Sequence, residues 1–210
     1  MQTIWITGGS SGIGFATANE FLSNGWQVII SSSNKEKLEN AKKKLSKNIN
    51  TDLLHIITCD ISNKNDVDNT IDQIENKIGE IDIALLNASA YSPNKNQIFD
   101  ISNYELLVDV NIKGTLYCIN KLKDFMKNRN NTIAIISSPL GYRGWPTAGA
   151  YGISKAAQLS LSESLYFDFK KIGINVRVIC PGFIDTEATR RNSFKMPFLK
   201  SANYAGKKYS

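Results

Sequence analysis

The sequence predicts an α/β fold with a doubly wound parallel sheet between two layers of helices. Short apolar segments alternate with amphipathic helical segments along the chain, which is the pattern of βαβ crossovers. A glycine-rich turn, Gly8 to Gly14, follows the first apolar segment directly and leads into a helical one. Residues 81–90 form a near-continuous apolar run, which is typical of a central parallel strand buried on both faces.

Length and composition limit the class of protein. A chain of 210 residues is long enough for one domain with a sizeable core and too short for two ordinary domains, so we expect residues 1–210 to form a single domain. No apolar run approaches the roughly 18 residues that a membrane span needs. The first expected strand begins too early to leave room for a signal peptide. We therefore expect a cytoplasmic protein with no membrane partner.

Cysteine and histidine usage gives no metal or disulfide signal. The three cysteines, Cys59, Cys118 and Cys180, are far apart, odd in number and without CxxC spacing, so we expect small core residues. His55 is the only histidine and has no second ligand at a suitable spacing, which predicts no metal site. The net charge of +6 comes from dispersed lysines, and the dense run at 42–44 falls on an expected surface helix. We therefore expect no nucleic-acid partner, although the positive field favours an anionic cofactor.

The glycine turn is the first candidate binding element. Residues 2–7 are expected to form a buried strand, and the pattern after Gly14 is helical. Glycines permit positive φ and let backbone amides approach a ligand, while the start of a helix offers free N–H groups to a pyrophosphate. The strand before the turn and the helix after it favour a dinucleotide site over a tight turn without a ligand.

The end of the second expected strand, residues 26–31, bears on cofactor choice. In dinucleotide-binding folds an Asp or Glu near this point bonds the ribose 2′-hydroxyl of NAD. Here the position is Ser32, followed by Ser33 and, a little further on, Lys35. The missing carboxylate, the hydroxyls and the lysine favour NADP, although no arginine is present to bind the phosphate, and NAD remains the alternative.

The remaining elements alternate in the same way. Asn111 and Gly114 are poor in helix interiors, so we expect an irregularity near Asn111 in an otherwise long helix, 101–126. Because ligands bind outside the carboxyl ends of parallel strands, the residues that follow each strand are the candidate site. The other expected elements are helices at 34–47, 64–78 and 149–171 and strands at 52–58, 132–137 and 174–180.

Tyr151 and Lys155 supply the candidate chemistry. They stand four residues apart at the start of the 149–171 helix, so both side chains lie on one helix face. An ammonium near a phenol favours the ionised form, which would lower the pKa of Tyr151 from about 10. The pair is therefore a candidate general acid and base, although an isolated pair at this spacing is most often a coincidence.

Together these motifs resemble those of the short-chain dehydrogenase/reductase family. Thr7 to Gly14, TGGSSGIG, is similar to its TGxxxGIG cofactor loop, and Tyr151 to Lys155 is similar to its YxxxK motif. Asn87 and Ala88 resemble the start of its NAG motif, in which Ser89 replaces the glycine. Further similarities are Asp60 to its adenine-contacting aspartate, Asn111 to its helix asparagine, Ser138 to its catalytic serine, and Pro181-Gly182 with Thr186 to its PGxxxT segment.

The resemblance implies a Rossmann fold and an NAD(P)-dependent oxidoreductase. Tyr151 would be the general acid and base and Ser138 would stabilise the substrate oxygen. Lys155 would favour the tyrosinate and bond the nicotinamide ribose, and Asn111 would hold a relay water. The implied catalytic residues are Asn111, Ser138, Tyr151 and Lys155. The implied cofactor-binding residues are Gly8, Ser10, Ser11, Gly12, Ile13, Gly14, Ser32, Ser33, Asp60, Ile61, Asn87, Ala88, Tyr151, Lys155, Pro181, Gly182, Ile184 and Thr186.

The resemblance also sets expectations for substrate and partners. Many family members continue further, so we expect the seventh strand to be missing and residues 183–210 to form a substrate lid. The pocket walls, 89–93, 140–147 and 183–198, should suit an apolar or ring-bearing carbonyl compound or alcohol, with Tyr91, Tyr142, Trp145, Phe194, Met196 and Phe198 among the candidate lining residues. The two long helices could pair in a homodimer or homotetramer. A non-catalytic dinucleotide-binding sensor or interaction protein, and a lyase or epimerase with the same tyrosine, remain alternatives.

Overall fold

A six-stranded parallel sheet organises the chain. The computed structural model describes residues 1–47, 50–93 and 99–210. The strand order is β3-β2-β1-β4-β5-β6, so the chain reverses its direction across the sheet between β1 and β4. This order confirms the doubly wound fold. The strands are β1 (Thr3–Thr7), β2 (Gln27–Ser32), β3 (Leu54–Thr58), β4 (Ile83–Leu86), β5 (Asn131–Ile136) and β6 (Ile174–Ile179).

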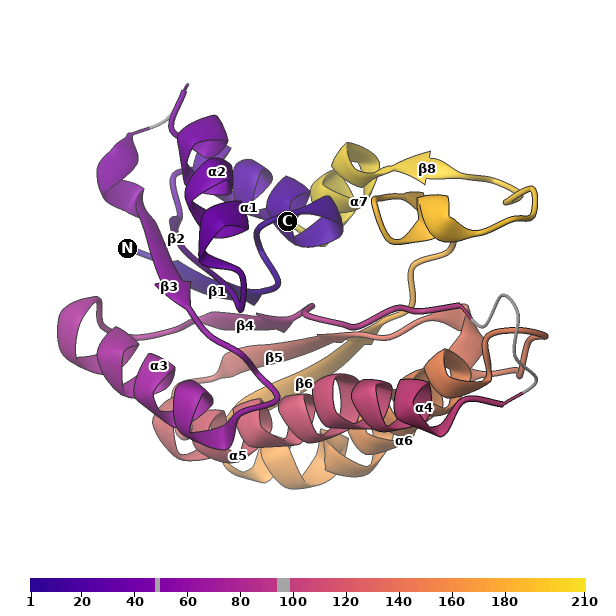
Figure 1. The fold of residues 1–210 in the computed structure, drawn as a ribbon. Coiled ribbons are helices and arrows are strands. Elements are labelled where there is room, and N and C mark those ends of the chain that lie inside the picture. Colours follow the sequence, from indigo (N-terminus) through magenta and orange to yellow (C-terminus); the bar gives the residue numbers. More distant parts are fainter. Residues whose placement is uncertain (48–49, 94–98) are drawn as a thin grey trace.

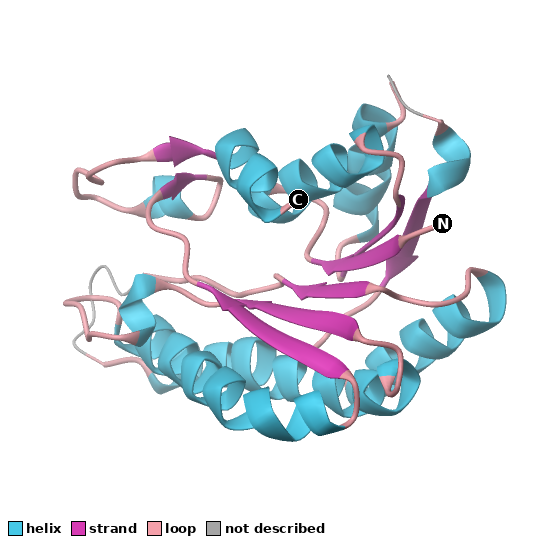
Figure 2. Ribbon diagram, turned by 180° about the vertical axis from the view of Figure 1, so that it is seen from behind, coloured by secondary structure: helices cyan, strands magenta, loops and turns pink. Residues whose placement is uncertain are grey.

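Helices cover both faces of the sheet (Figures 1 and 2). The side chains of β1 show how the two core layers form, because Ile4 and Ile6 enter one apolar cluster and Trp5 the other. Burial of alternate side chains on opposite faces explains why the strands are continuous apolar runs. One face carries α1 (Gly12–Ser23), α2 (Lys35–Leu45) and α7 (Ala202–Tyr209). The other carries α3 (Lys64–Lys77), α4 (Ile101–Leu107), α5 (Gly114–Met126) and α6 (Gly149–Lys171).

The expected long helix at 101–126 is interrupted. A π-helical segment, Val108–Lys113, separates α4 from α5 and contains Asn111. The irregularity expected near Asn111 is therefore confirmed. Gly114 is the first residue of α5, and a Cβ there would lie 2.8 Å from the Ile61 side chain. Glycine at this position therefore lets the helix pack closely against the segment after β3.

The last part of the chain adds elements that the sequence did not predict. Two short strands, β7 (Ile184–Asp185) and β8 (Lys200–Ser201), pair in parallel and lead into α7. This helix packs on α1 (Figure 1), and a Cβ at Gly206 would lie 2.7 Å from the backbone of Ala16. Within the described residues the main sheet ends at β6, without a seventh strand.

The described residues give little indication of other classes of site. None of the described helices combines the length and apolar character that a bilayer crossing requires. Across residues 1–47, 50–93 and 99–210, no group of His, Cys, Asp and Glu side chains could hold a metal ion. Cys59 and Cys118 are buried core residues as expected, whereas Cys180 is half-exposed at the end of β6.

Candidate active site

A cleft of about 980 Å³ opens at the carboxyl ends of the strands. It spans the point between β1 and β4 where the strand order reverses, which is where open α/β sheets bind ligands. Apart from Gly14 and Asn111, every cofactor-binding and catalytic residue that the sequence predicts lines this cleft. The topology thus brings together residues from Gly8 to Thr186.

The glycine turn packs too tightly for side chains. Gly8 has φ +65°, and a Cβ there would lie 2.8 Å from the Cα of Ala88. Gly14 lies behind the turn, and its Cβ would lie 2.6 Å from the carbonyl oxygen of Gly8. Ser11 precedes α1 as its N-cap and forms no side-chain cap bond, so the first amides of the helix have no side-chain acceptor. Such free N–H donors at a helix start are suited to binding an anion.

Gly14→Ala should therefore destabilise the protein. The added methyl group would overlap the Gly8 carbonyl and the Asn87 amide, each 2.6 Å away, and overpacking of this kind costs about 1–3 kcal/mol. We expect a lower Tm in thermal unfolding followed by circular dichroism. Gly144→Ala is the matched control, because Gly144 has no heavy atom within 4 Å of its Cβ position. Equal Tm values for the two variants would contradict the tight packing.

The end of β4 is tied to the glycine turn by hydrogen bonds. The amides of Asn87 and Ala88 both donate to Thr7 Oγ1 at 3.0 Å, and Asn87 Nδ2 donates to the Thr7 carbonyl at 3.0 Å. These bonds draw the chain away from the strand ladder, which explains why only Ile83–Leu86 of the expected 81–90 strand is regular. They fix the floor of the cleft.

Ser138, Tyr151 and Lys155 meet at the centre of the cleft. Ser138 follows β5, and its side chain lies close enough to Tyr151 to lower the pKa of the phenol. Lys155 Nζ lies 5.3 Å from the centroid of the Tyr151 ring. The ring of Tyr91 packs edge-on against Tyr151 with centroids 4.9 Å apart. The predicted serine, tyrosine and lysine are therefore neighbours in space.

Comparison with known proteins agrees with this geometry. Residues 2–196 match the family model described as short chain dehydrogenase. The chain belongs to the short-chain dehydrogenase family. An uncharacterized oxidoreductase of Staphylococcus aureus strain MW2 is 31% identical over 185 residues, which cover 88% of this chain and 78% of the relative. One from Staphylococcus haemolyticus strain JCSC1435 is 30% identical over 190 residues, with 90% and 80% coverage.

Solved structures show the same architecture. The structure of ElxO with NADP bound superimposes with a TM-score of 0.89 at 26% identity, covering 99% of this chain and 89% of that chain. A tyrosine-to-phenylalanine variant of ElxO with NADPH bound gives the same values. The short-chain dehydrogenase motifs therefore occur here on the matching fold.

Burial controls the charge states of the two central groups. It raises the pKa of Tyr151, and Tyr91 adds to this effect while the nearby Ser138 side chain opposes it. Burial also lowers the pKa of Lys155 to about 7. The expectation that Lys155 lowers the pKa of Tyr151 is wrong, because burial raises this pKa and the hydrogen bonds of Lys155 Nζ go to the Ile136 carbonyl and Gln158. At neutral pH Tyr151 is thus a protonated phenol.

Asn111 and Gln158 lie behind Lys155. Lys155 Nζ donates to the Ile136 carbonyl and to Gln158 Oε1, both at 2.9 Å. Gln158 Nε2 donates to the Asn111 carbonyl at 2.9 Å, which also accepts from Thr115 Oγ1 at 2.7 Å. This carbonyl therefore accepts from two side chains, and the role of Asn111 in holding a relay water stays a prediction. The Asn111 side chain holds the backbone of Ala90.

The cleft contains, beside Ser32, a lysine that the sequence analysis missed. Ser10 Oγ donates to Ser32 Oγ at 3.2 Å, and both serines line the cleft. Lys37 lines the cleft beside them and pairs with Glu187 at 3.3 Å, whereas Lys35 does not line the cleft. Lys37 lies in the first turn of α2, two residues after Lys35. The expected start of this helix at Asn34 could therefore have indicated it.

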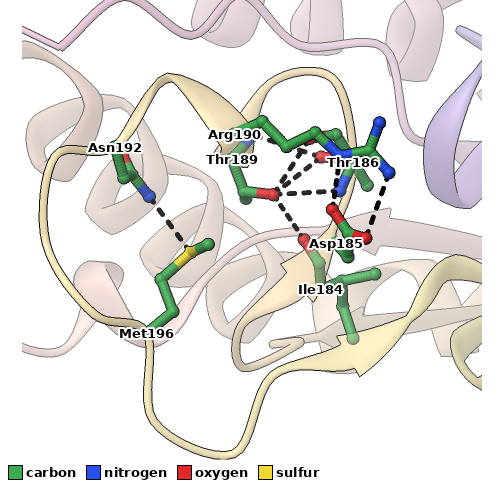
Figure 3. A network of polar contacts seen from close by, with 7 residues as sticks. All are labelled: Ile184, Asp185, Thr186, Thr189, Arg190, Asn192 and Met196. Atoms are coloured by element: carbon green, nitrogen blue, oxygen red, sulfur yellow. Dashed lines mark hydrogen bonds and ion pairs between the residues drawn. The ribbon is translucent and has the colours of Figure 1, made fainter.

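A polar network holds the loop above the cleft (Figure 3). Thr189 Oγ1 donates to the Ile184 carbonyl at 2.6 Å and accepts from the Thr186 amide at 3.0 Å. Arg190 forms a two-pronged ion pair with Asp185, with Nε 2.7 Å from Oδ1. Thr189 was not predicted as a site residue, yet it fixes Thr186, which lines the cleft.

The expected aromatic walls are only partly correct. Tyr91, Trp145 and Phe194 line the cleft as predicted, together with Phe183. The other three predicted side chains, Tyr142, Met196 and Phe198, do not line it, and Phe198 is 91% exposed. Asn192 also lines the cleft, where it accepts a hydrogen bond from the Tyr91 hydroxyl, and it donates to Met196 Sδ at 3.4 Å.

Proposed function

We propose that this protein is an NADP-dependent oxidoreductase that transfers hydride between the nicotinamide and a small carbonyl or alcohol substrate, with Tyr151 as general acid and base. The observation that carries the proposal is the meeting of Ser138, Tyr151 and a buried Lys155 in the cleft that the glycine turn borders. Membership of the short-chain dehydrogenase family and the NADP bound in ElxO support it.

The cleft residues fit a dinucleotide. A Cβ at Gly8 would collide with the cleft floor, and Gly12 has φ +55°, so only glycines give a ligand access to the turn amides. The uncapped N-terminus of α1 suits the pyrophosphate. Asp60 lines the cleft and would contact the adenine, and Ser62 fixes its carboxylate through bonds of 2.7 and 3.0 Å. Ile184 and Thr186 line the cleft too and would orient the carboxamide.

The mechanism follows from the three central residues. When bound, the cofactor supplies or accepts the hydride. Tyr151 gives its proton to the carbonyl oxygen in reduction and takes one from the hydroxyl in oxidation. Ser138 donates to the same oxygen as negative charge develops on it. Lys155 supplies positive charge beside the tyrosinate that forms, and the raised pKa of Tyr151 favours reduction because the phenol begins protonated.

Paired measurements of binding and turnover test this function. NADPH and NADH are titrated into the protein with nicotinamide fluorescence as readout, and a panel of apolar and ring-bearing carbonyl compounds is then screened for NADPH oxidation. We expect NADPH to bind more tightly and at least one compound to be reduced. Tight binding without any turnover would instead indicate a dinucleotide-binding sensor.

Ser32→Asp should reverse the cofactor preference. A carboxylate there would accept from the 2′-hydroxyl of NADH and repel the 2′-phosphate of NADPH, which Ser32, Ser33 and Lys37 would otherwise bind. We expect NADPH affinity to fall about tenfold or more, equivalent to about 1.4 kcal/mol. Ser164→Asp, which adds the same charge on the exposed side of α6, is the control. An unchanged NADPH-to-NADH ratio in Ser32→Asp would contradict the NADP assignment.

Exposed apolar side chains support self-association. They lie on the helices of one face of the sheet, and they are Ile101, Leu106, Leu116, Ile153 and Phe167. Contact between subunits through these helices would remove such side chains from water. We propose a homodimer or homotetramer formed through α4, α5 and α6, acting in the cytoplasm.

A further inference from the structure

Gln158 is a buried polar residue that the mechanism above does not use. It follows Lys155 by three residues on α6 and is only 2% exposed. Its Oε1 accepts from Lys155 Nζ, and its Nε2 donates to both the Asn111 carbonyl and Thr115 Oγ1, with all three distances 2.9 Å. The side chain thus joins α6 to the π-helical segment and the start of α5.

The orientation of this amide is fixed by its partners. An ammonium only donates and a carbonyl only accepts, so Gln158 cannot reverse its oxygen and nitrogen without losing both bonds. Thr115 Oγ1 gives its own proton to the Asn111 carbonyl and is left to accept from Nε2. Lys155 has no ion pair within the described residues, so its charge depends on two neutral acceptors, Gln158 and the Ile136 carbonyl.

We propose that Gln158 is a positioning residue that holds the Lys155 ammonium beside Tyr151 and maintains its charge. The inference rests on the proposed function, because it concerns the lysine that would assist proton transfer. An amide N–H does not ionise near neutral pH, so this link to Asn111 transmits position but not protons.

The surroundings of Lys155 leave few other groups that set its charge. Tyr151 faces it from the same helix, and Cys180 is the titratable group that acts on it from the end of β6. Ile136 at the end of β5 and the two serines that follow it carry no charge, and neither do Asn111 and Thr115. Removal of the Gln158 acceptor should therefore lower the pKa of Lys155 further, and a carboxylate in its place should raise it.

Two variants with opposite expected effects test this inference. In the reductive direction the rate should fall as pH rises through the pKa of Lys155, because the neutral amine no longer stabilises the tyrosinate. We expect Gln158→Leu to lower kcat about tenfold or more. The pH at which the rate falls should also decrease by about one unit, as loss of a hydrogen bond to a charged group predicts. In Gln158→Glu the rate should fall at a higher pH than in the parent protein. The KM for substrate should change little in both.

A ligand-free measurement separates this inference from the proposed function. In the folded Gln158→Leu variant, Lys155 should take up a proton less readily than in the parent protein. The Tm of the variant should therefore fall further below the parent Tm as pH falls through 7. Gln73→Leu, exposed on α3, is the matched control and should show no such trend. Parallel Tm curves and an unchanged pH dependence of the rate would overturn the role of Gln158. Absence of turnover in the parent protein would overturn the proposed function, while the Tm comparison would still decide the link to Lys155.

Discussion

Tyr151→Phe is expected to lower turnover by about 10²–10⁴-fold, the usual contribution of a general acid, while cofactor affinity stays nearly unchanged. The phenylalanine ring retains the volume of Tyr151 and its edge-on contact with Tyr91, at a centroid distance of 4.9 Å. Only the hydroxyl, the proposed proton donor, is removed. NADPH oxidation measures turnover, and nicotinamide fluorescence measures binding on the same preparation.

The separation of these two readouts is what makes the test specific to the mechanism. Tyr166→Phe is the matched control, since it removes a hydroxyl from the same helix at a ring that packs on Phe167. It should retain full activity. Turnover by Tyr151→Phe at the parent rate would disprove the acid and base role, whereas a parallel loss of cofactor binding would indicate a damaged cleft.

The sequence predicted much of the fold and of the cleft because the informative patterns are local. A strand, a glycine turn and a helix occupy adjacent positions, and Tyr151 and Lys155 lie one helical turn apart. The carboxyl ends of parallel strands then meet at one edge of the sheet, which brings Ser138 to Tyr151 without further information. Asn111 was likewise recognisable as a helix irregularity from its neighbours alone.

The parts that the sequence did not predict depend on contacts between distant residues. Lys37 and Glu187 are 150 positions apart, and Gln158 and the carbonyl of Asn111 are 47 apart. No spacing rule links such pairs. The pKa of Tyr151 was expected to fall because helix spacing indicates that Lys155 is near, but spacing carries no information on burial, which dominates.

Lys155→Met is expected to abolish most turnover and, at the same time, to change stability in a pH-dependent way. Lys155 is 1% exposed, and its folded-state pKa of about 7 lies below the ordinary value of 10.5 because burial disfavours its charge. At and below pH 7 the folded protein carries the full cost of burying this charge. Between pH 7 and 10.5 the cost falls, and above 10.5 the amine is neutral in both states. The Tm difference between the methionine variant and the parent should therefore favour methionine most at pH 7 or below.

Thermal unfolding across this pH range measures the effect, at about 2–4 °C for each kcal/mol in a chain of this size. Methionine also leaves the Ile136 carbonyl and Gln158 Oε1 without their donor, and this cost in stability does not depend on pH. The decisive result is therefore the change of the Tm difference with pH, not its value at one pH. Lys170→Met, at an exposed position on the same helix, should give a flat difference. A flat difference for Lys155→Met as well would mean that the buried lysine is uncharged or better solvated than its surroundings imply. A slope would mean that the protein retains a destabilising buried charge at the position where proton transfer needs it.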